Sequence, residues 1–210
     1  MTYLISVLIP TLYERTHQFN ALLSSIYKEL NDNDLNSKVE ILSICDNRNM
    51  GLCKKRNMLQ KLSTGKYFTH LDDDDRVVDG YFIKLVKHIE GLKDLPDIIA
   101  FDQICFVGED TFIVKPDITL NLTLHTGPVK SEKDLKVYYR YPWQFHLFNE
   151  RFKKVYRTES DSPDKINKPH MFDDVNFLKK IQLEKPNRME YVNEILHEYH
   201  FEDPSKTTTQ

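Results

Sequence analysis

The sequence predicts an α/β protein of a single domain, in which a mixed β-sheet is flanked by helices. Through the first hundred residues, short apolar runs alternate with segments whose apolar residues repeat at helical spacing. Beyond residue 101 the pattern changes to short pieces separated by turn residues, which is typical of antiparallel hairpins. A chain of 210 residues with 40% hydrophobic composition can bury one sizeable core, so we expect no second full domain.

The first strand–helix–strand unit is predicted from two apolar runs and the segment between them. Residues 5–10 form a continuous apolar run, as expected for a strand that is covered on both faces. From residue 19 to residue 30 the apolar side chains repeat at helical spacing. Residues 39–44 form the second strand, which ends in the polar turn stretch 46–51.

The next unit places acidic residues at the end of a strand. Residues 52–62 have helical composition, and residues 66–71 form a short strand that ends directly at four consecutive aspartates. An amphipathic helix is predicted over residues 81–92 and a further strand over residues 97–101. Open α/β sheets bind their ligands at the carboxyl ends of their strands, so the aspartates stand where a ligand is expected.

Antiparallel strands are predicted in the second half of the chain. Residues 103–107 and 111–115 flank the turn stretch 108–110, and residues 118–124 alternate between apolar and polar. Residues 125–136 have turn and charge composition and are expected to form a loop. Residues 204–210 are expected to form a tail.

The bulk composition excludes several classes of protein. A formal net charge of −3 and a pI near 6.2 provide no general field that would collect nucleic acid or an anionic membrane. The apolar residues 1–10 lack a basic leading region and are too short to cross a bilayer. Cys45, Cys53 and Cys105 are odd in number and show no paired metal spacing, which favours reduced thiols. We therefore expect a cytoplasmic protein without a transmembrane segment, in which phosphate recognition is local.

The acidic run Asp72 to Asp75 is the strongest chemical signal. Four adjacent carboxylates repel one another unless a cation or solvent neutralises them. A solvated acidic turn is the alternative interpretation, but the run follows an apolar strand and offers the oxygen ligands that Mg²⁺ or Mn²⁺ prefers. An EF-hand is excluded because the sixth-position glycine and the terminal glutamate are missing.

Several segments resemble the family 2 glycosyltransferases of the GT-A fold. In chain order, these segments are Val7-Leu8-Ile9-Pro10-Thr11, Gly51-Leu52-Cys53-Lys54-Lys55-Arg56-Asn57, Gly65-Lys66-Tyr67, Leu71-Asp72-Asp73-Asp74-Asp75, His146-Leu147-Phe148-Asn149, Phe172-Asp173-Asp174-Val175-Asn176-Phe177 and Tyr199-His200. These segments occur in the order found in the family, and together they span nearly the whole chain. The resemblance implies a GT-A, Rossmann-like sheet and a nucleotide-sugar donor, for which a UDP-sugar is expected.

The resemblance also implies roles for the donor-site residues. The nucleoside pocket is expected to be lined by Pro10, Thr11 and Glu14 or Arg15. Asp46 would hydrogen-bond the nucleobase, and Asp72 would hold the ribose. Arg56, with Lys55 as a further candidate, would approach the diphosphate, for which a guanidinium is suited. Asp74 would hold Mn²⁺ or Mg²⁺ together with Asp72, and Asp73 or Asp75 would be the spare carboxylate. His200 or His197 would complete the metal shell; the alternative for both is an ordinary surface or half-buried histidine.

Catalysis is assigned to a pair of aspartates by the same resemblance. Inverting transfer needs a carboxylate that takes the proton from the acceptor hydroxyl. Asp174 is the expected base and Asp173 the alternative, since the family more often has a glutamate at the first position. Helix capping is the competing interpretation of both residues. Trp143, His146 and Asn149 are expected near the donor sugar or the acceptor.

The acceptor half of the site is less well defined. A basic cluster is predicted either to meet an acidic acceptor or to be solvated; it consists of Arg151, Lys153, Lys154 and Arg157. Residues 1–101 would bind the donor and residues 102–203 a glycan, lipid-linked or protein acceptor, with no nucleic-acid partner. A nucleotidyltransferase is one alternative, although residues 11–15 contain no glycine; a non-catalytic nucleotide-sugar-binding module is the other.

Overall fold

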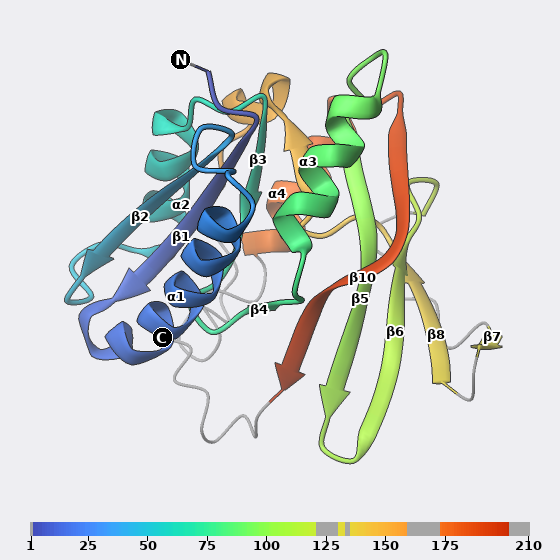
Figure 1. The fold of residues 1–210 in the computed structure, drawn as a ribbon, viewed down its shortest axis with the longest axis horizontal. Helices are drawn as coiled ribbons and strands as arrows, with labels where there is room; N and C mark the ends of the chain where they lie inside the picture. Colours follow the sequence, from blue (N-terminus) through green and yellow to red (C-terminus); the bar gives the residue numbers. More distant parts are fainter. Residues whose placement is uncertain (1, 121–129, 133–134, 159–172, 202–210) are drawn as a thin grey trace.

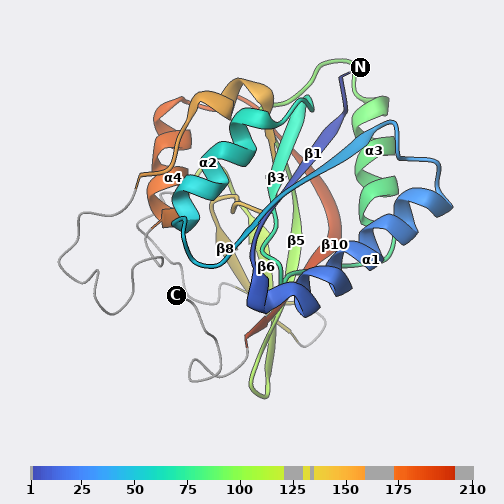
Figure 2. The same ribbon diagram turned by 90° about the vertical axis from the view of Figure 1, so that its left-hand side faces the viewer.

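A large mixed β-sheet runs through the middle of the protein, with helices on both faces (Figures 1 and 2). The computed structural model describes residues 2–120, 130–132, 135–158 and 173–201. The strands are β1 (Ile5–Leu12), β2 (Val39–Asp46), β3 (Tyr67–His70), β4 (Arg76–Val77), β5 (Ile98–Val107), β6 (Asp110–Pro116), β7 (Lys130–Glu132), β8 (Leu135–Arg140), β9 (Leu147–Asn149) and β10 (Met189–Phe201). The helices are α1 (Thr16–Asp32), α2 (Leu52–Leu62), α3 (Tyr81–Gly91) and α4 (Asp173–Leu183), with the 3-10 helices η1 (Tyr13–Arg15) and η2 (Glu150–Lys154). The predicted α/β class is confirmed.

The sheet consists of a parallel part, formed by β1, β2 and β3, and a mixed part around β5, and β9 connects the two. β1 lies between β2 and β3 and is parallel to both. β9 pairs antiparallel with β3 on one side and with β5 on the other, and so joins the two parts. β5 then pairs antiparallel with β6 and parallel with β10. β10, the last strand among the described residues, also pairs antiparallel with the short β4.

The core is divided by the sheet into two hydrophobic clusters, as the alternation of side chains along a strand requires. From β1, Ile5, Val7 and Ile9 join the buried side chains of α1 and α3. Leu8 points to the other face, where it packs with apolar residues of α2 and α4. The continuous apolar run of β1 is thereby explained, since both of its faces are covered.

The topology gathers polar residues at one edge of the parallel part. Leu12 of β1 pairs with Asp46 of β2, so both strands end at the same level. β3 is parallel to β1, and the aspartate run begins two residues after its last residue, His70. The amino end of α2 begins at this edge as well, because α2 follows β2 after a short loop.

Two predictions of secondary structure were wrong in the second half of the chain. Asp117 to Leu120 form a turn, in which the Asp117 carboxylate accepts the backbone N–H of Thr119 at 2.8 Å and its hydroxyl at 2.6 Å. Such side-chain hydrogen bonds compete with the strand ladder and end it. Residues 130–132 and 135–136, predicted within a loop, belong to β7 and β8; the rest of the predicted strand and loop and the predicted tail lie outside the described residues.

No helix in the described part of the chain has the length and apolar character needed to span a membrane. All three cysteines lie in the described residues and carry unbridged thiols: Cys45 is exposed, whereas Cys53 and Cys105 are buried.

Gly65 provides a test of the packing at the start of β3. A Cβ atom at Gly65 would lie 2.6 Å from Ser6 Oγ and 2.8 Å from the Tyr67 carbonyl oxygen, which is closer than real contacts allow. We expect Gly65→Ala to lower the free energy of unfolding by about 1–3 kcal/mol in a urea titration. Gly91→Ala is the matched control, because a Cβ there meets nothing within 4 Å and alanine favours the helix. Equal stability of the two variants would contradict this account of the packing.

Candidate active site

The aspartate run folds into a tight turn whose four carboxylates are contacted by side chains from several elements. The N–H of Asp75 donates to the carbonyl of Asp72 at 3.1 Å, and Asp75 Oδ2 accepts the N–H of Asp72 at 2.7 Å. The turn follows Leu71, whose N–H bonds the carbonyl of Leu8 at 3.2 Å. The four aspartates are therefore held in fixed directions at the end of β3, and we call residues 72–75 the aspartate turn.

Arg15 neutralises the two central carboxylates of the aspartate turn. Its Nη2 atom lies 2.5 Å from Asp73 Oδ1 and 2.7 Å from Asp74 Oδ2. Asp73 is only 5% exposed and also accepts the Thr11 hydroxyl at 2.7 Å. Burial raises the pKa of Asp73 to about 6, against the opposing effect of Thr11 and Arg15. Asp74 remains 54% exposed, which makes it the open carboxylate of the turn.

Arg56 of α2 holds the first carboxylate of the turn. Its Nη2 atom donates to Asp72 Oδ1 at 2.6 Å, and Gln144 Nε2 donates to Asp72 Oδ2 at 3.3 Å. Burial alone would raise the pKa of Asp72, but the adjacent Arg56 charge outweighs it and lowers the pKa below its ordinary value. Asp72 is therefore held as a carboxylate by a buried guanidinium.

The same guanidinium also reaches the start of α4. Arg56 Nη1 donates to Asp174 Oδ1 at 2.9 Å, and Arg157 Nη1 donates to the same oxygen at 2.7 Å. Arg157 is 2% exposed, bonds Gln144 Oε1 at 3.1 Å and stacks over the ring of Phe177 at 4.2 Å. Two arginines and two aspartates thus form a network that connects α2, α4 and the aspartate turn.

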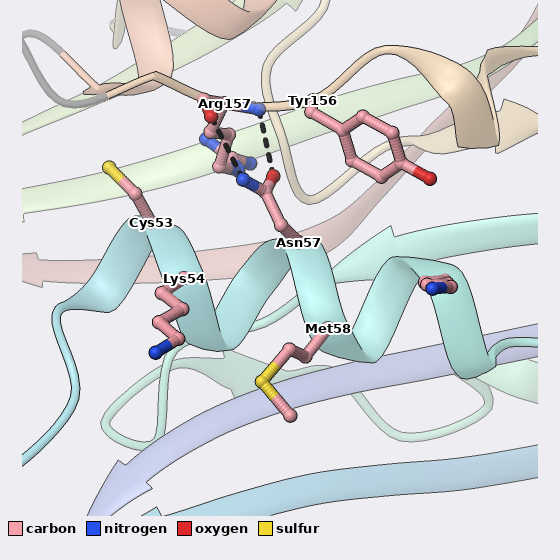
Figure 3. Close-up of a pocket in the computed structure, with 7 residues that line it drawn as sticks. Cys53, Lys54, Asn57, Met58, Tyr156 and Arg157 are labelled. Carbon is pink, nitrogen blue, oxygen red and sulfur yellow. Dashed lines mark hydrogen bonds between the residues drawn. The ribbon is translucent and has the colours of Figure 1, made fainter.

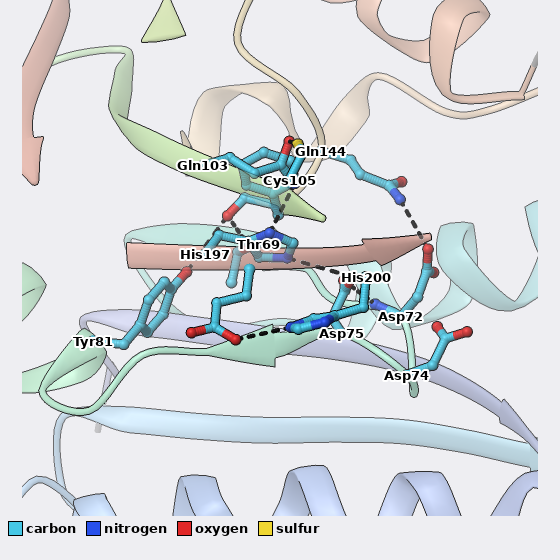
Figure 4. Close-up of polar contacts among 12 residues, drawn as sticks. Thr69, Asp72, Asp74, Asp75, Tyr81, Gln103, Cys105, Gln144, His197 and His200 are labelled. Atoms are coloured by element: carbon cyan, nitrogen blue, oxygen red, sulfur yellow. Dashed lines mark hydrogen bonds and ion pairs between the residues drawn. The ribbon is translucent and has the colours of Figure 1, made fainter. Parts of the chain in front are cut away.

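The fourth carboxylate of the turn faces the last strand. Asp75 Oδ1 lies 3.4 Å from His197 Nε2, and His197 Nδ1 lies 2.9 Å from Gln103 Nε2 (Figure 4). The His197 ring is 1% exposed and stacks on Phe145 with a centroid distance of 4.1 Å. Burial raises the pKa of Asp75, while His197 acts in the opposite direction.

Lys55 of α2 contacts the ends of both β1 and β2. Its ammonium forms an ion pair with Asp46 and donates to the Thr11 carbonyl at 2.7 Å. Asp46 Oδ2 accepts the N–H of Met50 at 2.6 Å. Burial would raise the pKa of Asp46, but Lys55 and this N–H lower it below its ordinary value. Pro10 lies buried in β1 beside this group.

The contacts of the other predicted site residues described here are with residues outside the aspartate turn. Glu14 forms an exposed ion pair with Arg48, and His200 lies 2.9 Å from Glu198 Oε2. The guanidinium of Arg140 lies over the Trp143 ring, and its Cζ atom is 4.9 Å from the ring centroid. Asn149 accepts the N–H of Arg151 at 3.0 Å. Asp173 is the first residue of α4, and its side chain lies outside the described part.

His146 lies inside the core and bonds the backbone through both ring nitrogens. Nδ1 accepts the N–H of Trp143 at 2.7 Å, and Nε2 lies 3.0 Å from the carbonyl of Phe101. Because a carbonyl can only accept, Nε2 carries a proton; Nδ1 also lies 3.0 Å from the Trp143 carbonyl, and burial favours the neutral ring by lowering the pKa of His146. The role of His146 in acceptor binding stays a prediction, while its contacts in the structure are those of a packing residue.

The predicted basic cluster does not form one surface. Arg157 is buried in the network, Arg151 pairs with Asp97 at 2.7 Å, and Lys153 donates to the Gly65 carbonyl at 2.7 Å. Lys154 pairs with Glu184 at 3.3 Å. The interpretation as a solvated face was therefore wrong for Arg157, whose local sequence gives no sign that tertiary packing covers it.

Two cavities adjoin these residues. One, of about 570 Å³, lies between α1 and the aspartate turn; its lining includes Arg15, Gln18, Leu22, Asp73, Asp74, Asp75, Arg76, Glu198 and His200. The other, of about 290 Å³, lies along α2 beside Arg157 and Tyr156, where Asn57 exchanges hydrogen bonds with the Arg157 backbone (Figure 3). The aspartate turn is thus reached from the α1 side.

The residues near the turn have the donor chemistry of a hard cation but no closed cage. Among the described residues, no group of three histidine, cysteine, aspartate or glutamate side chains is arranged to hold a metal ion. In enzymes that act on phosphate compounds, Mg²⁺ is commonly held by one or two carboxylates together with substrate phosphates. The half-exposed Asp74 fits that mode of binding.

Comparison with known proteins identifies the fold. No family model matches the chain, and no curated protein matches its sequence. The crystal structure of S. aureus TarS 1-349 in complex with UDP-GlcNAc aligns with a TM-score of 0.57 at 14% identity, over 95% of this chain and 59% of that chain. The complex of TarS 1-349 with UDP gives a TM-score of 0.56 at 13% identity, over 94% of this chain and 60% of that chain.

The fold is GT-A-like. This chain spans about three fifths of the length of TarS 1-349, and it covers 37% of the S. aureus TarS chain, with a TM-score of 0.55 at 11% identity. At this identity the match establishes the fold, and the chemistry must be argued from the residues at the site.

Buried histidines predict a loss of stability in acid. Burial lowers the pKa of His146 to about 3, from an ordinary value of 6.5. The unfolded chain therefore binds the proton more readily, and the contribution of neutral His146 is lost as pH falls from about 6.5 towards 3. At pH 5 we expect a loss of about 2 kcal/mol in the free energy of unfolding from this group. Urea titrations at pH 7 and pH 5 measure it.

His146→Gln should show a smaller loss between these pH values, whereas the exposed His17→Gln should behave as the unmodified protein. An undiminished loss in His146→Gln would show that other groups carry the acid sensitivity.

Proposed function

We propose that this protein is a glycosyltransferase that transfers a sugar from a nucleotide-sugar, a UDP-sugar, to a hydroxyl acceptor. One observation carries the proposal: Asp46, Lys55, Arg56 and the aspartate turn gather at the carboxyl ends of β1, β2 and β3. Parallel α/β sheets bind nucleotides at this edge. The GT-A-like fold supports the same conclusion, because TarS 1-349 has been crystallised with UDP-GlcNAc and with UDP.

The donor nucleotide is assigned to the ends of the first two strands. Pro10, Thr11 and Glu14 would line the nucleoside, and Asp46 would accept a hydrogen bond from the base. Lys55 is already neutralised by Asp46, so it shapes the pocket and adds little net charge for the phosphates. Residues 1–101 form this donor half in our proposal.

The ribose and diphosphate are assigned to Asp72, Arg56 and Arg15. Asp72 is kept ionised by Arg56 and can accept from ribose hydroxyls. Arg56 and Arg157 together place two positive charges beside the turn, and Arg15 places a third on its α1 side. Each of these guanidiniums is already paired with an aspartate, so they would orient the diphosphate through hydrogen bonds, while a bound divalent cation would supply the net positive charge.

The metal is assigned to the open side of the turn. Asp74 would hold Mn²⁺ or Mg²⁺, with Asp72 and His200 as further ligands and Asp73 as the spare carboxylate tied to Thr11 and Arg15. A bound divalent cation supplies Lewis-acid stabilisation of the leaving group.

The general base is assigned to Asp174, with Asp173 as the alternative, and the transfer inverts the anomeric configuration. Within the described residues, the contacts of Asp174 with Arg56 and Arg157 use Oδ1. An oxygen that accepts from two guanidiniums is a poor proton acceptor, so Oδ2 would take the proton from the acceptor hydroxyl. The two arginines would keep the carboxylate in its orientation.

The acceptor is assigned to residues 102–203 and is a glycan, a lipid-linked sugar or a protein. Trp143, His146 and Asn149 remain its candidate contacts. A cytoplasmic location, expected from the unpaired cysteines, belongs to the same proposal.

The metal role of Asp74 is testable by ligand-dependent stability. In a thermal-shift experiment, UDP-GlcNAc with Mn²⁺ should stabilise the protein by about 2.7 kcal/mol at 100 times the dissociation constant. Asp74→Ala should remove most of the Mn²⁺-dependent part, together with the slow release of UDP. Asp110→Ala is the control, because Asp110 is 74% exposed at the first position of β6 and lies outside the aspartate turn. No stabilisation of the unmodified protein by any nucleotide-sugar would overturn the proposal, and binding without turnover on any acceptor would indicate a binding module.

The base is tested by an isosteric amide. Asp174→Asn keeps an oxygen that accepts from Arg56 and Arg157 but cannot take a proton. We expect donor binding to be retained within about twofold and transfer to fall by about 10²–10⁴-fold, measured as UDP release with and without acceptor. Asp173→Asn, tested in parallel, separates the two candidates. Full transfer by Asp174→Asn would assign the base elsewhere.

A further inference from the structure

A chain of polar side chains connects β8 to the aspartate turn through β5 and β10; Gln103 and His197 in it are buried, whereas Arg140 and Asp75 are partly exposed. Arg140 Nη2 lies 2.7 Å from Gln103 Oε1, and Gln103 Nε2 lies 2.9 Å from His197 Nδ1. His197 Nε2 in turn faces Asp75 Oδ1 at 3.4 Å, and Asp75 Oδ2 accepts the N–H of Asp72. Figure 4 shows Gln103, His197 and Asp75 in sequence along this chain.

The first member of the chain determines the orientation of the second. Arginine can only donate, so the Gln103 atom that faces Arg140 must be the carbonyl oxygen Oε1. The Cys105 thiol lies 3.5 Å from the same oxygen and donates to it. With Oε1 occupied in this way, the amide group of Gln103 points at His197. The amide orientation thus follows from donor chemistry.

The orientation of Gln103 then determines which nitrogen of His197 carries the proton. An amide NH₂ can only donate, so Nδ1 must accept and cannot hold a hydrogen. In the neutral ring the proton is therefore on Nε2, the nitrogen that faces the Asp75 carboxylate. The stacked Phe145 ring and the near-complete burial of His197 keep the imidazole in this plane.

The contacts of Arg140 hold its guanidinium in the position that determines the orientation of Gln103. Its guanidinium lies over the rings of Trp143 and Phe145, at 4.9 and 5.3 Å from their centroids. Burial lowers the pKa of Arg140 to about 10, which leaves it a cation at neutral pH. The donor at the start of the chain is therefore permanent.

We propose that Arg140 is a positioning residue, which acts through Gln103 to fix His197 in its Nε2–H tautomer and thereby holds Asp75 and the aspartate turn in place. This role goes beyond the proposed function and rests on it only for the identity of the ligand at the turn. It assigns His197 to the support of the turn, because an Nε2 that carries a proton and faces Asp75 has no lone pair for a metal. His200 remains as the candidate histidine ligand.

The tautomer is measured by long-range ¹H–¹⁵N NMR of the full-length protein, with the His197 ring assigned from the spectrum of His197→Gln. We expect an unprotonated Nδ1 and a protonated Nε2 in the unmodified protein at neutral pH. A protonated Nδ1 in that spectrum overturns the proposal without any variant.

Three variants test which side chain determines the His197 tautomer. Arg140→Met removes the obligatory donor, so the Gln103 amide can turn and Nδ1–H should appear; Arg140→Lys keeps a donor and should retain the original tautomer. Gln103→Glu accepts from both neighbours and should produce an Nδ1–H signal in a protein whose Arg140 is intact. An unchanged His197 spectrum in Arg140→Met and Gln103→Glu overturns the proposal. If Arg140→Met fails to fold, Gln103→Glu and the unmodified protein still decide it.

The consequence for the turn has a separate readout. Mn²⁺-dependent binding of UDP should weaken about tenfold in Arg140→Met and recover in Arg140→Lys. If the unmodified protein binds no UDP, the proposed function fails while the tautomer measurement still tests Arg140. Arg140→Met could change the tautomer and still bind UDP as tightly as the unmodified protein. That result would overturn the claim that the polar side chains from Arg140 to His197 hold the aspartate turn in place.

Discussion

Neutralisation of clustered carboxylates is the constraint on which the site depends. Asp72 to Asp75 would repel one another in a low-dielectric setting, and each of them has a partner that reduces this cost. Arg56 comes from α2, Arg15 from η1 and His197 from β10. The conformation of the turn is therefore defined by side chains from three separate elements, and the sheet topology is what brings these elements to one edge.

The same arginines connect the donor half to the candidate base. Arg56 contacts both Asp72 and Asp174, and Arg157 contacts the same Asp174 oxygen as Arg56. Loss of one partner from a fully buried pair costs about 3–5 kcal/mol, and we expect a smaller cost here because the side chains of Asp72 and Asp174 are 38% and 19% exposed. Stability and the geometry of the site are therefore carried by the same side chains, and neither can be changed alone.

The sequence revealed the parts that depend on local patterns. The apolar runs of β1 to β3 and the helical period of α1 to α3 identify the α/β class, and the residues at the strand ends identify Asp46 and the aspartate turn. β10 was not predicted, because register shifts after Val192 and Ile195 break the alternation that marks a strand. Arg140, Gln103 and Gln144 were not predicted as site neighbours either, since only tertiary contacts bring them there.

The late position of β10 has a consequence for how the protein is made. β10 pairs in parallel with β5, and His197 follows Asp75 by 122 residues in the sequence. Contacts of such large sequence separation form slowly and only after both partners have been synthesised. A nascent chain on the ribosome can thus assemble the β1–β3 layer early, but the aspartate turn of that layer stays without its histidine partner until translation has passed β10.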